Sequence, residues 1–201
     1  MPTISDLVDR LRDELAGAAF ASQVEAAVAR AVDHYSTEPW WFLEHEDTAS
    51  TAAGIATVAL PTDYEVIRNV TATVNGYREP LCAKPYDWYV DRLNATTASN
   101  EPDYYSIFGE TCYLWPTPDQ VYTITFSYIR KLSAALTTDN EWSATAGYLI
   151  GYRAKWDIYL NINQDFELAT LMKQAEGEAY SRLRRRSRNR RASPDRTALY
   201  C

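Results

Sequence analysis

The sequence predicts an α+β fold in which helices at both ends of the chain flank a region of β-strands. Apolar residues recur at spacings of three and four over residues 3–38 and again over 144–190, which is the periodicity of amphipathic helices. Between them, short runs alternate apolar and polar side chains and are separated by turn residues, as in strands. With 201 residues, 46% of them apolar, the chain is long enough to bury one sizeable core.

Two helices are predicted before the strands. The first covers residues 3–16, and Gly17 is placed to end it. Its apolar face is formed by Ile4, Leu7, Val8, Leu11 and Leu15. The second begins at Ser22, where Ser-Gln-Val-Glu matches a capping box. It ends near Glu38, because Pro39 disfavours helical geometry in the residue before it.

The middle of the chain is predicted to form an antiparallel β region. Residues 66–74 alternate, with Val70, Ala72 and Val74 on one face and polar residues on the other. Asn75-Gly76 then supplies the two positive-φ positions of a tight hairpin turn. Further candidate strands are residues 41–46, 54–60, 104–108, 112–115 and 121–130, and residues 85–93 are expected to form a short helix.

The helix predicted for residues 144–161 is apolar around nearly its whole circumference. Such a helix must be buried on more than one side. Either it lies at the centre of the fold, or a neighbouring subunit covers part of it. The second alternative makes Tyr148, Tyr152, Trp156 and Tyr159 candidates for a subunit interface.

A last long helix is predicted to start near Asp165 and to run into an arginine-rich segment before Pro194. Its apolar stripe is formed by Leu168, Leu171, Met172, Ala175, Ala179 and Leu183. The predicted segments are therefore an N-terminal helix pair (residues 1–40), a β insertion (41–132), C-terminal helices (142–190) and a C-terminal tail (191–201).

The charges are divided unevenly along the chain. The net formal charge is −7, yet residues 182–201 contain eight arginines and one acid, a charge of +7, which leaves −14 for the first 181 residues. Such a segment repels itself, so its surroundings must be an acidic protein surface, the phosphates of a nucleic acid, or solvent. The candidate binding residues are Arg184, Arg185, Arg186, Arg188, Arg190 and Arg191, with Leu199 and Tyr200 as a short apolar anchor.

No pattern typical of a nucleotide-dependent enzyme or a zinc protease occurs, and the three cysteines lack CxxC spacing. His45 lies among Glu44, Glu46 and Asp47, a combination that could bind a metal or transfer protons in a hydrolase. In an extended strand these side chains would alternate between two faces, which fits a solvated edge better. We therefore expect a protein that is not an enzyme, with no catalytic residue, no metal and no cofactor.

Membrane insertion is not expected either, because no run approaches the roughly 18 consecutive apolar residues of a membrane-spanning helix. The sequence thus predicts no membrane partner and folding in the cytoplasm.

Four short sequence motifs follow one another between the two predicted helix pairs. They are Trp40-Trp41-Phe42, Ala59-Leu60-Pro61-Thr62-Asp63, Tyr113-Leu114-Trp115-Pro116-Thr117-Pro118-Asp119, and Val121-Tyr122-Thr123-Ile124-Thr125-Phe126-Ser127-Tyr128-Ile129-Arg130-Lys131. In this order, over about residues 3–185, the chain resembles the head-to-tail adaptor proteins of tailed bacteriophages, also called connectors or tail accessory factors.

The resemblance implies a structural protein of the virion with a helical bundle, made of two N-terminal and two C-terminal helices, that carries an antiparallel β insertion. It also implies a homo-oligomeric ring, commonly a dodecamer, that binds the portal protein and receives tail or nozzle proteins in the neck between head and tail. Assembly would take place in the host cytoplasm. The arginine-rich tail would then meet the portal or, without sequence preference, packaged DNA. The alternatives are a nucleic-acid-binding protein that uses the same arm and a neighbouring tail-completion protein.

Overall fold

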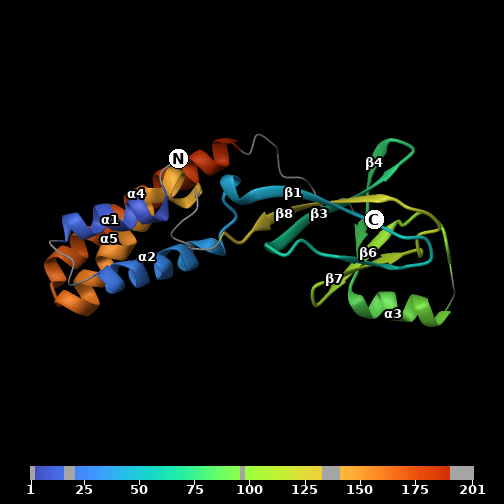
Figure 1. Ribbon diagram of the computed structural model, residues 1–201, viewed down its shortest axis with the longest axis horizontal. Coiled ribbons are helices and arrows are strands. Elements are labelled where there is room, and N and C mark those ends of the chain that lie inside the picture. The colour runs from blue at the N-terminus through green and yellow to red at the C-terminus, as the bar shows by residue number, and fades with distance from the viewer. Residues whose placement is uncertain (1–2, 16–20, 96–97, 133–140, 191–201) are drawn as a thin grey trace. The chain divides into compact units, whose positions relative to one another are not determined.

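The structure is a computed structural model that describes residues 3–15, 21–95, 98–132 and 141–190 (Figure 1). Its internal contacts divide the chain into two units. The described residues of the helical unit lie within Met1–Leu43 and Leu132–Arg196, and those of the β unit lie within Glu44–Lys131. Apart from one helix within the β unit, helices and sheets occur in separate parts of the chain, so the predicted α+β class is confirmed.

The helical unit is built around one central helix. Its described α-helices are α1 (Ile4–Glu14), α2 (Ala21–Ser36), α4 (Glu141–Ile158) and α5 (Phe166–Arg190). Helix α4 packs against all three others and continues as a π-helical turn, Tyr159–Asn163, before Gln164 adopts a positive φ of 54°. Because α4 is surrounded on several sides, its nearly all-round apolar character is largely explained within one chain.

The capping box lies at the start of α1 and not at the start of α2. The backbone N–H of Asp6 donates to the Thr3 hydroxyl at 3.0 Å, and the backbone N–H of Thr3 donates to the Asp6 carboxylate at 2.7 Å. Ser22 lies inside the first turn of α2, so the capping box predicted there is wrong. A capping residue must precede the first helical turn, and Ser22 does not.

The buried face of α5 also differs from the predicted stripe. Leu168 and Leu171 are 38% and 55% exposed. Leu183 is buried as predicted, but the other buried residues of this helix are Ala169, Glu176 and Ser187. The predicted stripe is therefore wrong at Leu168 and Leu171, and the charged residue Glu176 lies in the buried face.

The β unit consists of two four-stranded sheets with strand orders β1-β8-β3-β4 and β2-β7-β6-β5. The strands are β1 (Glu44–Ser50), β2 (Thr57–Ala59), β3 (Tyr64–Val74), β4 (Tyr77–Pro80), β5 (Cys82–Ala83), β6 (Tyr104–Phe108), β7 (Thr111–Trp115) and β8 (Thr123–Arg130). One apolar cluster contains buried residues of both sheets, among them Val70, Phe126 and Leu114.

The prediction of a wholly antiparallel region is wrong for one strand pair. Strands β5 and β6 pair in parallel. Helix α3 (Tyr86–Ala95) lies between them in the chain, and this crossover returns the chain to the same end of the sheet, as a parallel pair requires. The start of the strand predicted for residues 41–46 is likewise a 3-10 turn, Trp41–Leu43, which precedes β1.

The predicted hairpin turn is confirmed, because Asn75 and Gly76 have φ values of 49° and 83° between the paired residues Val74 and Tyr77. We expect Gly76→Ala to lower the free energy of unfolding of the β unit by about 1 kcal/mol, since a side chain disfavours this left-handed conformation. Asn75→Gly, which suits a positive φ, should change it by less than about 0.5 kcal/mol. Urea unfolding followed by circular dichroism measures both; equal losses would contradict the turn assignment.

Within the described residues, no helix has the length and apolar character needed to cross a bilayer.

Candidate functional site

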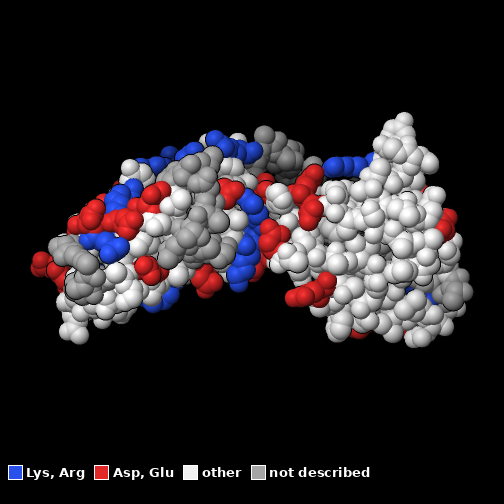
Figure 2. Space-filling view, viewed as in Figure 1, with Lys and Arg blue, Asp and Glu red and all other residues white. Residues whose placement is uncertain are grey.

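The C-terminal half of α5 carries six arginines whose side chains are all exposed: Arg182, Arg184, Arg185, Arg186, Arg188 and Arg190. Figure 2 shows Lys and Arg side chains gathered where this part of α5 runs along the helical unit. Arg191, Leu199 and Tyr200, also predicted to bind a partner, lie outside the described residues. The described arginines fall into two groups that differ in what they contact.

Three of these arginines contact aromatic rings of their own chain. Arg184 lies 5.7 Å from the centre of the Tyr180 ring and donates a hydrogen bond of 3.0 Å to its hydroxyl. Arg186 and Arg190 lie 5.5 and 5.3 Å from the centre of the Trp41 ring. Such cation–π contacts are attractive, so Arg186 and Arg190 connect the end of α5 to Trp41, which follows α2, while the ring contacted by Arg184 belongs to α5 itself.

The other three, Arg182, Arg185 and Arg188, form no ion pair, hydrogen bond or ring contact within the part of the chain that the structure describes. At about 100° per residue, they occupy an arc of about 120° on α5. The centre of this arc is opposite Glu176, Leu183 and Ser187, the residues that α5 buries. We call Arg182, Arg185 and Arg188 the arginine face.

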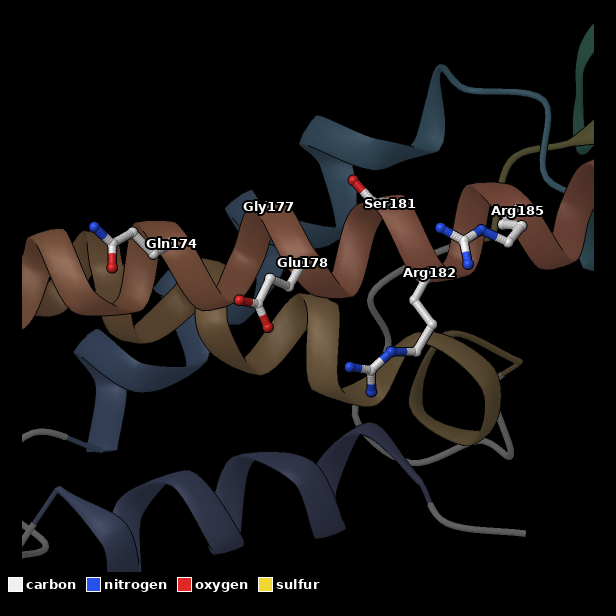
Figure 3. Close-up of a pocket in the computed structure, with 6 residues that line it drawn as sticks. All are labelled: Gln174, Gly177, Glu178, Ser181, Arg182 and Arg185. Carbon is white, nitrogen blue, oxygen red and sulfur yellow. The ribbon is translucent and has the colours of Figure 1, made fainter.

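An open groove on the surface of α5 includes part of the arginine face. It has a volume of about 530 Å³ and is lined by Gln174, Gly177, Glu178, Ser181, Arg182 and Arg185 (Figure 3). At Gly177, a Cβ atom would have no neighbour within 4 Å. Small side chains at Gly177 and Ser181 therefore leave room for another chain next to the cationic side chains.

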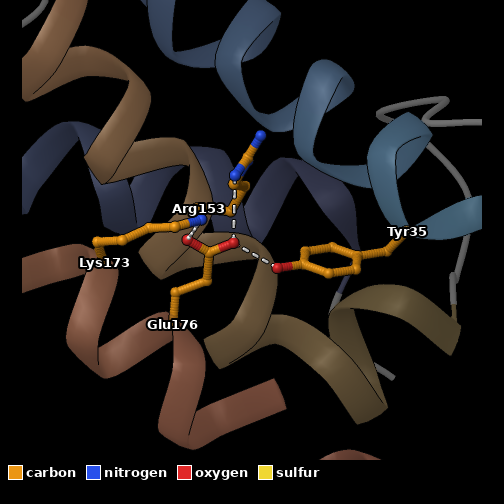
Figure 4. Close-up of polar contacts among 4 residues, drawn as sticks. All are labelled: Tyr35, Arg153, Lys173 and Glu176. Carbon is orange, nitrogen blue, oxygen red and sulfur yellow. Dashed lines mark hydrogen bonds and ion pairs between the residues drawn. The ribbon is translucent and has the colours of Figure 1, made fainter.

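The rotation of α5 is fixed by a buried carboxylate (Figure 4). Glu176 accepts hydrogen bonds from the Tyr35 hydroxyl of α2 at 2.5 Å and from the Lys173 ammonium at 2.8 Å, and it pairs with Arg153 of α4 at 3.3 Å. Burial raises the pKa of Tyr35, and its hydrogen bond to Glu176 raises this pKa further, so the phenol stays a donor. These contacts connect three helices and turn the arginine face outward.

Helix α4 leaves a tyrosine surface uncovered, although it is the central helix. Tyr148 is 72% exposed, stacks on Tyr152 with ring centres 6.5 Å apart, and lies 5.6 Å from the Arg10 guanidinium of α1. Tyr159 is half-buried. Trp156 differs from these tyrosines, because Arg153 and Lys173 lie 4.3 and 4.9 Å from the centre of its ring. The structure thus assigns Trp156 contacts within its own chain.

Helix α1 presents an acidic face that was not predicted from the sequence. Asp6, Asp9 and Asp13 are exposed. They lie opposite the buried residues Ile4, Leu7, Val8 and Leu11. Asp9 pairs with Arg12 at 3.1 Å, a contact on the surface of the same helix. The spacing of three and four residues between the aspartates was the signal that could have identified this face.

The carboxylates around His45 lie on a sheet edge. Strand β1 is the outermost strand of its sheet, and Glu44, His45, Glu46 and Asp47 are exposed, which confirms the predicted solvated edge. Glu46 accepts hydrogen bonds from Ser127 at 3.0 Å and Arg78 at 3.2 Å, and these lower its pKa. Among the described residues, no group of three or more His, Cys, Asp and Glu side chains could hold a metal ion.

Cys112 is a core residue. It is fully buried in β7, and burial raises the pKa of its thiol to about 12. A protonated thiol without solvent access is a poor nucleophile, so Cys112 contributes packing.

Nearly the whole chain, residues 2–198, matches the model of a family of phage head-to-tail adaptors. The protein is therefore a phage adaptor protein, which makes it a structural component of the virion that interacts with other head or tail proteins. Specifically, the chain belongs to the SU10 adaptor protein family. No curated protein matches the chain.

Proposed function

We propose that this adaptor forms a ring, with twelve copies as in the commonest arrangement, that joins the portal to the tail machinery in the neck of the virion. The observation that carries the proposal is the arginine face. Three exposed cations without a partner in the described chain are free to pair with an acidic or phosphate-bearing surface outside it. A ring supplies such surfaces at every subunit, because each copy meets two neighbours as well as the proteins above and below it.

The two groups of arginines support two different binding roles. Because Arg186 and Arg190 contact Trp41, the end of α5 is held against the residues that follow α2. We assign the portal contact to the last residues of the chain, which include Arg191, Leu199 and Tyr200. Guanidinium groups followed by a short apolar end suit an acidic groove with an apolar floor.

Removing residues 191–201 is expected to reduce binding to the portal ring of the same phage at least tenfold, because the charged and apolar anchors are lost together. Native mass spectrometry of mixtures with purified portal measures the bound copies, and circular dichroism at 222 nm should show unchanged helix content. Equal binding by the truncated and full chains would show that these residues do not contact the portal. A full chain that never binds portal would overturn the adaptor role.

Nucleic-acid binding is the second candidate, favoured by the placement of three unpartnered arginines on one helix face about 4.5 Å apart along the axis. If these arginines bound DNA phosphates, Arg182→Gln/Arg185→Gln/Arg188→Gln would reduce the slope of log K against log salt by about 2.7. Under the adaptor proposal, fluorescence anisotropy with a DNA duplex should show the same weak affinity for both proteins.

A further inference from the structure

We infer that the arginine face of one copy binds the acidic face of α1 in the next copy. The contact would thus pair Arg182, Arg185 and Arg188 with Asp6, Asp9 and Asp13 of a second chain. This inference rests on the proposed ring and names the partner of the arginine face within it.

The two faces are complementary in charge and in length. On α1, the three aspartates lie within an arc of about 60° and span about 10.5 Å along the helix axis, because seven residues separate the first from the last. On α5, the three arginines span about 9 Å. Glu178 lines the same groove one turn before Arg182, and Arg12 pairs with Asp9 on α1, so the net charges of the two surfaces are +2 and −2.

The two faces also point in opposite directions. On α4, Gly151 faces α1, since a Cβ there would lie 3.7 Å from the Leu11 side chain. Arg153 faces α5, where it pairs with Glu176. Two residues of helix correspond to a rotation of about 200°, so α1 and α5 pack on opposite sides of α4. A head-to-tail ring requires two different binding surfaces on opposite sides of each subunit.

The groove on α5 allows a helix to come close. The small residues Gly177 and Ser181 line it, and the space around a Cβ at Gly177 is open. The exposed ring of Tyr148 lies against Arg10 on α1 and would add apolar area at the border of the acidic face. Because exposed ion pairs are individually weak, we expect the charges to select which faces meet, while ring closure holds every subunit by two contacts.

Charge reversal on either face alone should prevent ring formation. The α5 variant is Arg182→Glu/Arg185→Glu/Arg188→Glu, and the α1 variant is Asp9→Arg/Asp13→Arg, which spares the capping residue Asp6. Each variant places like charges at every contact. We expect the number of copies bound per portal ring, counted by native mass spectrometry, to fall at least tenfold for each at a concentration where the wild type fills the ring.

An equal mixture of the two variants should restore the ring. In an alternating arrangement, arginines on α1 meet glutamates on α5, and aspartates on α1 meet the unchanged arginine face. The matched control is Glu25→Arg/Asp33→Arg, which reverses two exposed acids of α2 and should bind like the wild type.

Three results would overturn the inference. If both variants fill the ring alone, or if the mixture of two folded variants does not, the contact between α1 and α5 is wrong while the proposed ring stands. If the wild type itself neither assembles nor binds portal, the proposed function fails together with the inference.

Discussion

Replacing Glu176 with alanine is expected to lower the free energy of unfolding of the helical unit by about 3 kcal/mol. The Glu176 side chain is 4% exposed and that of Arg153 is 20% exposed, so removing the carboxylate leaves a largely buried guanidinium without its anion. The Tyr35 hydroxyl also loses its acceptor. Lys173, whose side chain is 51% exposed, regains water and adds little to the loss.

Urea unfolding followed at 222 nm measures this change. Glu176→Gln keeps an acceptor for Tyr35 but no charge, so it should cost about half as much. Glu178→Ala, two residues away and exposed, should change the stability by less than about 0.5 kcal/mol. Equal losses for Glu176→Ala and Glu178→Ala would show that the network does not stabilise the helical unit.

The same carboxylate should make the stability depend on pH. Burial opposes ionisation of Glu176, but hydrogen bonds from Lys173 and Tyr35 and the charges of Lys173 and Arg153 outweigh it, so its pKa falls below the ordinary 4.5. A pKa lowered by folding contributes stability above the unfolded value, and this contribution is lost as the pH falls through the folded value. The stability gap between wild type and Glu176→Gln should therefore be constant near neutral pH and shrink below about pH 4.5. A gap that grows on acidification would contradict this.

Helix α1 and the β3–β4 hairpin show which parts of the fold could be predicted from sequence. Ile4, Leu7, Val8 and Leu11 were expected on one face of α1, and all four are buried. Asn75-Gly76 indicated the turn because few residues adopt positive φ at two successive positions. In both cases the determining interactions lie within a few residues along the chain, so local patterns suffice.

Helix α5 shows why the rest could not be predicted. Apolar residues indicated a stripe through Leu168 and Leu171, yet the buried face passes through Glu176. That residue is buried because Tyr35, 141 positions earlier, and Arg153, 23 positions earlier, pair with it. Contacts between positions so far apart leave no local pattern. The parallel pairing of β5 with β6 is similar, since it depends on where α3 returns the chain.

The sequence identifies the arginines of the candidate site, but not which of them contact aromatic rings and which form the arginine face. The arginine run is evident in the sequence, whereas its division depends on Trp41 and Tyr180, which come from different parts of the helical unit. For α4, periodicity left a central helix and a subunit interface as alternatives. The structure supports the first for Trp156 and leaves Tyr148 exposed for the second. The acidic face of α1 was not predicted, but it could have been identified from the sequence, because its aspartates follow helical spacing.

Trp40→Ala is expected to lower the free energy of unfolding of the helical unit by about 4 kcal/mol. Trp40 is 2% exposed, and its indole N–H donates to the Tyr35 carbonyl at 3.0 Å. Its ring lies 6.2 Å from Phe42 and meets Tyr180 edge to face at 5.9 Å. Truncation would leave a cavity beside the ring that holds Arg184, so the end of α5 should also lose helix content.

The adjacent Trp41 provides the matched comparison for Trp40. It is half-buried and contacts Arg186 and Arg190, so Trp41→Ala should cost only about 1 kcal/mol, the value of exposed cation–π contacts. Trp40→Phe should fall between the two, because it keeps a ring but leaves the Tyr35 carbonyl without its donor. Urea unfolding of the three variants measures this order. If Trp41→Ala were as damaging as Trp40→Ala, the end of α5 would depend on its arginine contacts more than on the aromatic core beneath them.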